Sequence, residues 1–325
     1  MPAQPVTRME VSTIDFFMKF SPQKFRETLG NDIKDDYELA ASQCKEPIDA
    51  LGGGCYVRKI YWSTGLMFQV SRWRTKQQES NIEMSEKDGV RALHLGGSMI
   101  QSAMRLSTPN DLELAYTRCM MGFLLFHPNP GHILMIGLGG GSLVKFVYER
   151  MPQTKITVVE ISPQVIATAR SYFSLPNDSE RLQVVTAEGG EYVASNPVTA
   201  DILMVDGFDD GCQVGTLCSQ DFYNRARESL NKNGVLVVNL LSRDRGREEY
   251  MRRIQHTFNG HVLILMTEVR GNQIVFALKH SPGKLAWEEL SRRAENLESE
   301  LALPFSKFIM GLRKYNSHHD GYLEI

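Results

Sequence analysis

The stretch HILMIGLGGGSLVKFVYER, residues 132–150, decides the fold of this chain. A short apolar run predicts a buried strand, a glycine-rich turn follows it, and apolar positions then recur at helical spacing. Gly137, Gly139 and Gly141 are therefore expected before a helix N-terminus, where backbone N–H groups can approach a ligand closely. The motif alone is ambiguous, because a dinucleotide fingerprint has glycine or alanine where this chain has Ser142, and glycines also serve tight packing.

Apolar strands and amphipathic helices alternate from this stretch to about residue 278. We expect seven strands, at His132–Ile136, Lys155–Glu160, Leu182–Thr186, Ile202–Val205, Val235–Asn239, His261–Glu268 and Gln273–Leu278. The last two are joined by a connection too short for a parallel crossover, which predicts an antiparallel hairpin. The fold class is therefore α/β, a methyltransferase-type Rossmann fold in which a parallel sheet ends in an antiparallel hairpin.

The remainder of the chain suggests three further segments. A small antiparallel β domain is predicted before the Rossmann fold by short β-prone runs between turn signals, at Tyr56–Trp62, Leu66–Trp73, Asn81–Ser85 and Val90–Leu95. After it, two amphipathic helices, Leu285–Leu301 and Phe305–Tyr315, are expected to pack on the core or on a second subunit. The predicted division is an N-terminal extension (1–50), a small β-strand domain (51–110), a Rossmann-like nucleotide-binding catalytic domain (111–282) and a C-terminal helical tail (283–325).

Acidic side chains follow two of the predicted strands. Glu160 closes the second strand about 20 residues after the glycine loop, where a carboxylate can accept both ribose hydroxyl hydrogens. Glu188 and Gly189 follow the third strand, where a carboxylate can accept from an adenine amino group and a glycine leaves room for the ring. The alternative for Glu160 is an exposed acid near the N-terminus of the next helix.

Three aspartates follow the fourth strand, in the segment ILMVDGFDDG. Asp206 and Asp209, with Asp210 as a third candidate, reach the carboxyl edge of the sheet, where open α/β sheets bind ligands. Carboxylates there can orient and deprotonate an attacking amine, which is not a nucleophile while it is an ammonium. The alternative is a turn in which the aspartates cap backbone groups.

Composition limits the partners. The chain has 325 residues, a formal net charge of -2 and 42% hydrophobic residues. Such a balance predicts neither nucleic acid nor membrane binding. Its five cysteines are scattered without metal-ligand spacing, so we expect reduced thiols, no metal and a cytoplasmic protein. No apolar run reaches the roughly 18 residues of a membrane span, and the N-terminus lacks a hydrophobic signal core.

Several separated motifs resemble the spermidine synthase family of aminopropyltransferases. They are the glycine loop, Glu160, DGFDDGCQVGTLCSQDFY (206–223), VRALHLGGSMIQS (90–102), HPNP before the first strand and GNQIVFAL in the last. The similarity extends over roughly residues 75 to 280, with the motifs in the family's order.

The resemblance implies transfer of an aminopropyl group from decarboxylated S-adenosylmethionine to an amine such as putrescine, by a homodimer without a metal. It would assign Asp206 and Asp209 to catalysis; Gly137, Gly139, Gly141, Glu160, Glu188, Gly189 and Gln101 to nucleotide binding; and Tyr116, Asp210 and Tyr223 to the amine.

Two departures from the family pattern leave alternatives open. Gly140 stands where the family has an aspartate that pairs with the donor's amine, and losing one partner of a buried charge pair costs about 3 to 5 kcal/mol. Arg118 stands where the family has a glutamate, and its charge would repel a diamine. The alternatives are a methyl- or aminocarboxypropyl-transferase that uses intact S-adenosylmethionine, whose carboxylate suits a glycine loop, and a non-catalytic nucleotide-binding relative.

Overall fold

A computed structural model describes residues 55–62, 65–72, 82–95, 100–195, 199–209, 212–268 and 271–325. The chain divides into two compact units, Met1–Ser80 and Asn81–Ile325. In the first, β1 (Cys55–Trp62) and β2 (Gly65–Arg72) form an antiparallel pair. The predicted extension 1–50 lies outside the described residues.

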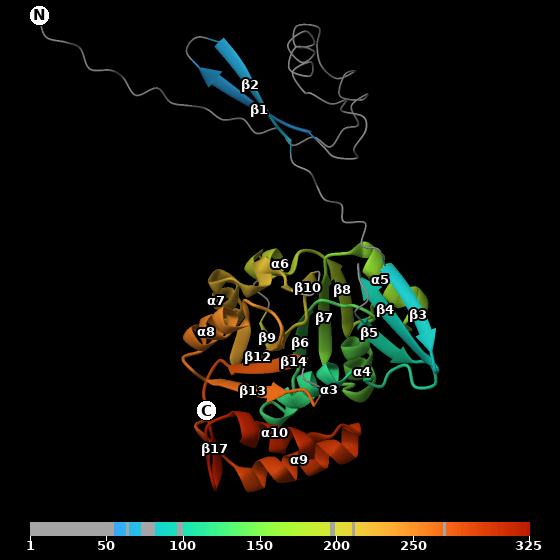
Figure 1. The fold of residues 1–325 in the computed structure, drawn as a ribbon, viewed down its shortest axis with the longest axis vertical. Helices are drawn as coiled ribbons and strands as arrows, with labels where there is room; N and C mark the ends of the chain where they lie inside the picture. Colours follow the sequence, from blue (N-terminus) through green and yellow to red (C-terminus); the bar gives the residue numbers. More distant parts are fainter. Residues whose placement is uncertain are drawn as a thin grey trace, which may run out of the picture. The chain divides into compact units, whose positions relative to one another are not determined.

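The second unit is built on a seven-stranded sheet with the order β13-β14-β12-β9-β6-β7-β8 (Figure 1). Its strands are β6 (His132–Ile136), β7 (Lys155–Glu160), β8 (Leu182–Thr186), β9 (Ala200–Val205), β12 (Leu230–Leu241), β13 (Val262–Met266) and β14 (Asn272–Leu278). Pairs among β12, β9, β6, β7 and β8 are parallel, whereas β14 runs antiparallel to both β12 and β13. The predicted methyltransferase-type sheet with its terminal hairpin is confirmed.

Helices cover both faces of this sheet because successive strand residues point to opposite sides. In β6, Ile133 and Met135 join one hydrophobic core cluster, while Leu134 and Ile136 join the other. Residues of α3 (Ala115–Met120), the 3-10 helix η2 (Met121–Leu125), α4 (Ser142–Arg150) and α5 (Pro163–Tyr172) enter the first cluster. Residues of α6 (Gly189–Ser195), the 3-10 helix η3 (Gly215–Cys218), α7 (Gln220–Glu228) and α8 (Arg247–Thr257) enter the second.

A three-stranded antiparallel sheet precedes α3 and packs beside the Rossmann sheet. It consists of β3 (Ile82–Lys87), β4 (Val90–Leu95) and β5 (Ile100–Arg105). Leu93 and Met104 of this sheet form a core cluster with Phe173, which caps the C-terminus of α5. The sequence predicted β3 and β4 but not β5. The unit boundary between Ser80 and Asn81 lies inside the predicted segment 51–110, and β3 to β5 belong with the larger unit.

The C-terminal helices pack as part of the core. Figure 1 shows α9 (Trp287–Leu301) and α10 (Phe305–Tyr315) lying together beside β13 and α3. Their buried faces, which include Leu290, Phe305 and Leu312, belong to the same cluster as β6 and η2. A small sheet joins β15 (Lys284–Ala286), just before α9, to β16 (His318–His319) and β17 (Tyr322–Glu324) after α10. The predicted helix 285–301 therefore begins two residues later than expected, and no strand was predicted after α10.

Candidate active site

Four residues lie in one row at the carboxyl edge of the parallel strands. Ile136 is level with Val159 and with Val205, and Val205 is level with Val238. The next residue of each strand path therefore sits in the same row: Gly137, Glu160, Asp206 and Asn239. The register thus brings the predicted ribose ligand and the predicted base to the same edge of the sheet, on either side of the glycine loop.

The glycine loop needs its first glycine for two reasons. Gly137 has φ +96°, a conformation that residues with a Cβ rarely adopt. A Cβ there would also collide with the main-chain carbonyl oxygen of Asp206. Gly141 has φ +72° and is the N-cap of α4. The loop consequently presses against the strand end that carries Asp206 and turns directly into a helix.

Gly140 is enclosed by neighbouring side chains. A Cβ on Gly140 would lie 2.8 Å from Cδ1 of Phe173 and 2.8 Å from Oγ of Ser102. Ser102 is buried on β5, and its hydroxyl lies 3.1 Å from that of Ser142, the first residue of α4. Position 140, where the spermidine synthase family has an aspartate, is therefore closed to any side chain here unless Phe173 and Ser102 move.

Glu160 is held rigidly beside the loop. Its side chain is 8% exposed and accepts hydrogen bonds from the N–H groups of Leu138 (3.0 Å) and Ser162 (2.9 Å), one on each carboxylate oxygen. Burial raises the pKa of Glu160, and these backbone donors act in the opposite direction by stabilising the ionised form. Each oxygen keeps a further lone pair that can accept a hydrogen bond from a ligand hydroxyl.

Asp206 is surrounded by neutral donors. Its Oδ1 accepts a hydrogen bond of 2.8 Å from the Nδ2 of Asn239. Burial raises the pKa of Asp206, while hydrogen bonds from Asn239 and from the hydroxyl of Tyr116 lower it. The Tyr116 hydroxyl also lies 3.1 Å from the carbonyl oxygen of Gln101. The hydroxyl of Tyr116 has one proton and two acceptors within reach, the carbonyl oxygen of Gln101 and the carboxylate of Asp206. The carboxylate is the stronger acceptor of the two.

The structure thus brings the main chain of Gln101 and the side chains of Tyr116 and Asp206 together, while their roles in binding and catalysis stay predictions. It also adds Asn239, which sequence reasoning placed only as the end of an apolar strand. The signal that was available is a lone amide in the apolar run VLVVNLL. A buried polar side chain in such a run needs a partner.

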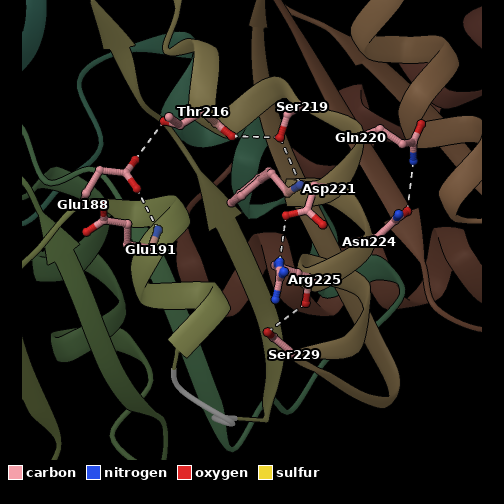
Figure 2. Close-up of polar contacts among 10 residues, drawn as sticks. Glu188, Glu191, Thr216, Ser219, Gln220, Asp221, Asn224, Arg225 and Ser229 are labelled. Carbon is pink, nitrogen blue, oxygen red and sulfur yellow. Dashed lines mark hydrogen bonds and ion pairs between the residues drawn. The ribbon is translucent and has the colours of Figure 1, made fainter. Parts of the chain in front are cut away.

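Glu188 has a local structural role in this structure. Its Oε2 accepts from the N–H of Glu191 (2.7 Å) in the first turn of α6, and its Oε1 accepts from the hydroxyl of Thr216 (2.8 Å) in η3. Figure 2 shows how these contacts continue through Ser219 toward α7. A Cβ on Gly189 would collide with Ile136, so this glycine permits α6 to pack closely against β6. The adenine contacts predicted for Glu188 and Gly189 stay predictions.

The other predicted substrate contacts are placed as follows. Asp209 lies in β10 (Phe208–Asp209), which pairs with β11 (Cys212–Gln213), and Asp210 lies outside the described residues. Tyr223 is 0% exposed in the core, and its hydroxyl has no hydrogen-bond partner among the described residues. Arg118 donates from Nη1 to the carbonyl oxygens of Leu112 (2.6 Å) and Glu113 (2.7 Å), at the start of its own helix.

The described part of the chain offers neither a metal-binding cluster nor a membrane-spanning helix. No group of three or more histidine, cysteine or acidic side chains there is arranged to hold a metal ion. No helix in those same segments has the length and apolar character needed to cross a bilayer. Cys119 and Cys218 are buried free thiols.

A glycine loop, an acid after the second strand and a buried aspartate after the fourth, on a sheet of this order, define a Rossmann-fold protein of the methyltransferase type. Residues 113–267 match the spermine/spermidine synthase domain. A polyamine aminopropyltransferase of Chromobacterium violaceum is 41% identical over 75% of this chain and 94% of its own length. The chain belongs to the spermidine synthase family of polyamine aminopropyltransferases, and it is a transferase.

Solved structures support the same fold. A probable spermidine synthase from Corynebacterium glutamicum has a TM-score of 0.57 at 20% identity, covering 74% of this chain and 93% of that one. Human methyltransferase-like protein 13, solved in complex with SAH, has a TM-score of 0.54 at 28% identity, covering 64% of this chain and 96% of that one. The predicted family is confirmed. Membership of this family of enzymes argues against the alternative of a non-catalytic nucleotide-binding relative.

Proposed function

We propose that this chain transfers an aminopropyl group from decarboxylated S-adenosylmethionine to a small amine at the carboxyl edge of its sheet. The observation that carries the proposal is the Asp206 carboxylate, enclosed by Asn239 and Tyr116, in the same row as Glu160. Family membership supplies the reaction class, since the similar proteins are named polyamine aminopropyltransferases.

The residues present fit the adenosine half of such a donor. Glu160 is fixed by the backbone of Leu138 and Ser162 and keeps free lone pairs for the two ribose hydroxyls. The loop at Gly137, Gly139 and Gly141 leaves no side chain between the backbone and a ligand. We assign the adenine edge to Glu188 and Gly189, with Glu188 exchanging a local contact for the ligand.

Asp206 then acts on the acceptor. When bound, the donor supplies a carbon activated by a positively charged sulfur. The amine nitrogen forms a bond to that carbon, the carbon–sulfur bond breaks, and its electron pair remains on sulfur in a neutral thioether. The amine must lose one proton before it can attack, and a buried carboxylate of raised pKa is suited to accept that proton. The product then leaves as a secondary ammonium. Asp209, Asp210 and Tyr116 complete the proposed acceptor pocket, and Gln101 lines the donor side; Tyr223, buried in the core, supports the pocket through packing.

A second candidate is transfer from intact S-adenosylmethionine. The enclosure of Gly140 by Phe173 and Ser102 favours it, because no side chain at position 140 can pair with a donor amine. The N–H groups of the loop suit the carboxylate that only the intact donor carries. The two candidates share the Glu160 and Asp206 roles and differ only at the donor's tail.

Product identification separates the two candidates. The protein is incubated with each donor and a panel of diamines and polyamines, and the nucleoside product is identified by mass spectrometry. Methylthioadenosine from the decarboxylated donor, together with an aminopropylated amine, supports the proposal. Methylthioadenosine from the intact donor indicates aminocarboxypropyl transfer, and adenosylhomocysteine indicates methyl transfer; either result without turnover of the decarboxylated donor overturns the proposal.

Assembly and location complete the proposal. We assign the enzyme as a cytoplasmic homodimer without a metal, on the family's habit and the scattered cysteines. Light scattering on the purified chain tests the homodimer. Activity after chelator treatment tests the absence of a metal requirement.

A further inference from the structure

Behind Asp206 lies a directed chain of two amide side chains. Asn239 of β12 is 1% exposed, and its Nδ2 donates to Oδ1 of Asp206 at 2.8 Å. The Oδ1 of Asn239 in turn accepts from the Nδ2 of Asn272, at the start of β14, at 2.9 Å. Both donors therefore point toward the carboxylate, from two neighbouring strands of the sheet.

Backbone hydrogen bonds fix Asn272, the amide farther from Asp206. The N–H of Asn272 donates to Oγ1 of Thr267 at 3.2 Å, and the N–H of Thr267 donates to the carbonyl oxygen of Asn272 at 3.1 Å. Since an amide group has a donor side and an acceptor side, the contacts of Asn239 with Asp206 and with Asn272 leave it one favourable orientation. The buried amide of Asn239 is thus hydrogen-bonded on both its donor and its acceptor side, which holds it rigidly.

We propose that Asn239, braced by Asn272, is a positioning residue for the transfer reaction: it occupies one oxygen of Asp206 and aims the remaining lone pairs at the acceptor nitrogen. The inference rests on the proposed function, in which Asp206 receives the acceptor's proton. Asn239 itself touches neither donor nor acceptor in this assignment and acts through the orientation and charge of Asp206.

The neutrality of the two amides matters for the chemistry. An arginine or lysine beside Asp206 would stabilise the carboxylate so strongly that it would become a weak base. Among the described side chains, the titratable group that interacts with Asp206 is Tyr116 of α3, while β12 and β14 supply Asn239 and Asn272, which are uncharged. Hydrogen bonds from uncharged groups therefore oppose the effect of burial on the pKa of Asp206, and they favour the ionised form that can accept a proton.

Strands β12 and β9 carry a matched control pair at their opposite ends, away from Asp206. Asn231 of β12 donates from Nδ2 to Oδ1 of Asp201 on β9 at 2.6 Å. The other oxygen of Asp201 accepts from the N–H groups of Gly131 (2.7 Å) and His132 (3.0 Å). This pair has the chemistry of the Asn239–Asp206 pair but serves the backbone at the amino ends of the strands.

The experiment compares the pH profile of kcat/KM for the wild type, Asn239→Leu, Asn272→Leu and Asn231→Leu. Loss of a donor to the ionised form raises the pKa of Asp206, so the acid limb moves to higher pH. We expect a shift of about one pH unit for Asn239→Leu, the scale of one charge-assisted hydrogen bond. Asn272 is only half-buried and acts through Asn239, so Asn272→Leu shifts the acid limb less and in the same direction. Asn231→Leu lowers the Tm without moving the limb.

A titration that does not depend on turnover completes the test. Carboxyl-labelled aspartate is followed by NMR, with the Asp206 signal identified by its loss in Asp206→Asn. An Asp206 pKa that rises in Asn239→Leu or in Asn272→Leu supports the inference whichever donor the enzyme uses. An unmoved pKa in both variants, or an equal shift in Asn231→Leu, overturns it. A wild type that turns over neither donor overturns the proposed function separately, because the NMR titration still reports on Asp206.

Discussion

Replacing Glu160 by glutamine tests the nucleoside-binding half of the site without opening a cavity. The glutamine keeps the side chain's shape, and its carbonyl oxygen can still accept from Leu138 or from Ser162. Its amide nitrogen then faces the other N–H and one ribose hydroxyl as a donor. Hydrogen bonds to a charged group contribute about 1.5 to 3 kcal/mol, so we expect affinity for methylthioadenosine to fall by about 1 to 3 kcal/mol, or roughly 5- to 150-fold in Kd.

Calorimetric titration of the wild type and of Glu160→Gln with methylthioadenosine measures this difference, at a temperature well below the Tm of both proteins. The loss of a backbone contact lowers the Tm as well, so a matched variant is needed. Glu188→Gln also disturbs a carboxylate that accepts from a backbone N–H, here that of Glu191. Its loss of affinity, through the adenine alone, should be smaller than that of Glu160→Gln. An unchanged Kd in Glu160→Gln would refute the assignment of the ribose to this residue.

Three further outcomes follow from the same geometry. Asp206→Asn should lower kcat by about 100- to 10,000-fold, the usual contribution of a general base, with methylthioadenosine affinity nearly unchanged by calorimetry; full activity would retire the assignment. Gly140→Ala should cost about 1 to 3 kcal/mol of stability by overpacking against Phe173 and Ser102, and a Tm equal to that of the wild type would show that these neighbours yield freely. Burial lowers the pKa of Lys145 to about 8, below its value in the unfolded chain, so the unfolded state binds more protons between these values and stability rises with pH there. Relative to Lys145→Met, the wild type should gain about 2 kcal/mol between pH 7.5 and 9.5 in denaturant titrations, and a pH-independent difference would contradict the burial argument.

The Rossmann sheet was predictable because its strands are buried runs with clear limits. The structure has β6, β7 and β8 at the residues predicted from sequence, and it confirms the hairpin of β13 and β14. The short connection between those two strands leaves only an antiparallel arrangement. Register then follows from the fold, so Glu160 and Asp206 arrive at the same edge without any further information from the side chains.

Elements that depend on tertiary contacts were missed. β5 carries the polar residues Gln101 and Ser102 in its first half, so it lacks the apolar pattern of a strand, yet Ser102 is buried against the glycine loop. The enclosure of Gly140 depends on Phe173, which is distant in sequence. Local pattern carries no signal for such contacts.

The catalytic neighbourhood was predicted in part for the same reason. Motif reasoning found Tyr116 and Asp206, which the structure joins, but it overlooked Asn239 and Asn272. Asn239 lies within one apolar run and Asn272 at the start of another, and their interaction follows only from the pairing of β12 with β9 and with β14.

A crystal structure with methylthioadenosine and an amine bound tests the central claim most directly. Both ribose hydroxyls should lie about 3 Å from the Glu160 carboxylate, and the thioether sulfur should lie between the glycine loop and Asp206, with the amine nitrogen within hydrogen-bond distance of that aspartate. A nucleoside bound elsewhere, or one whose sulfur points away from Asp206, would contradict the account.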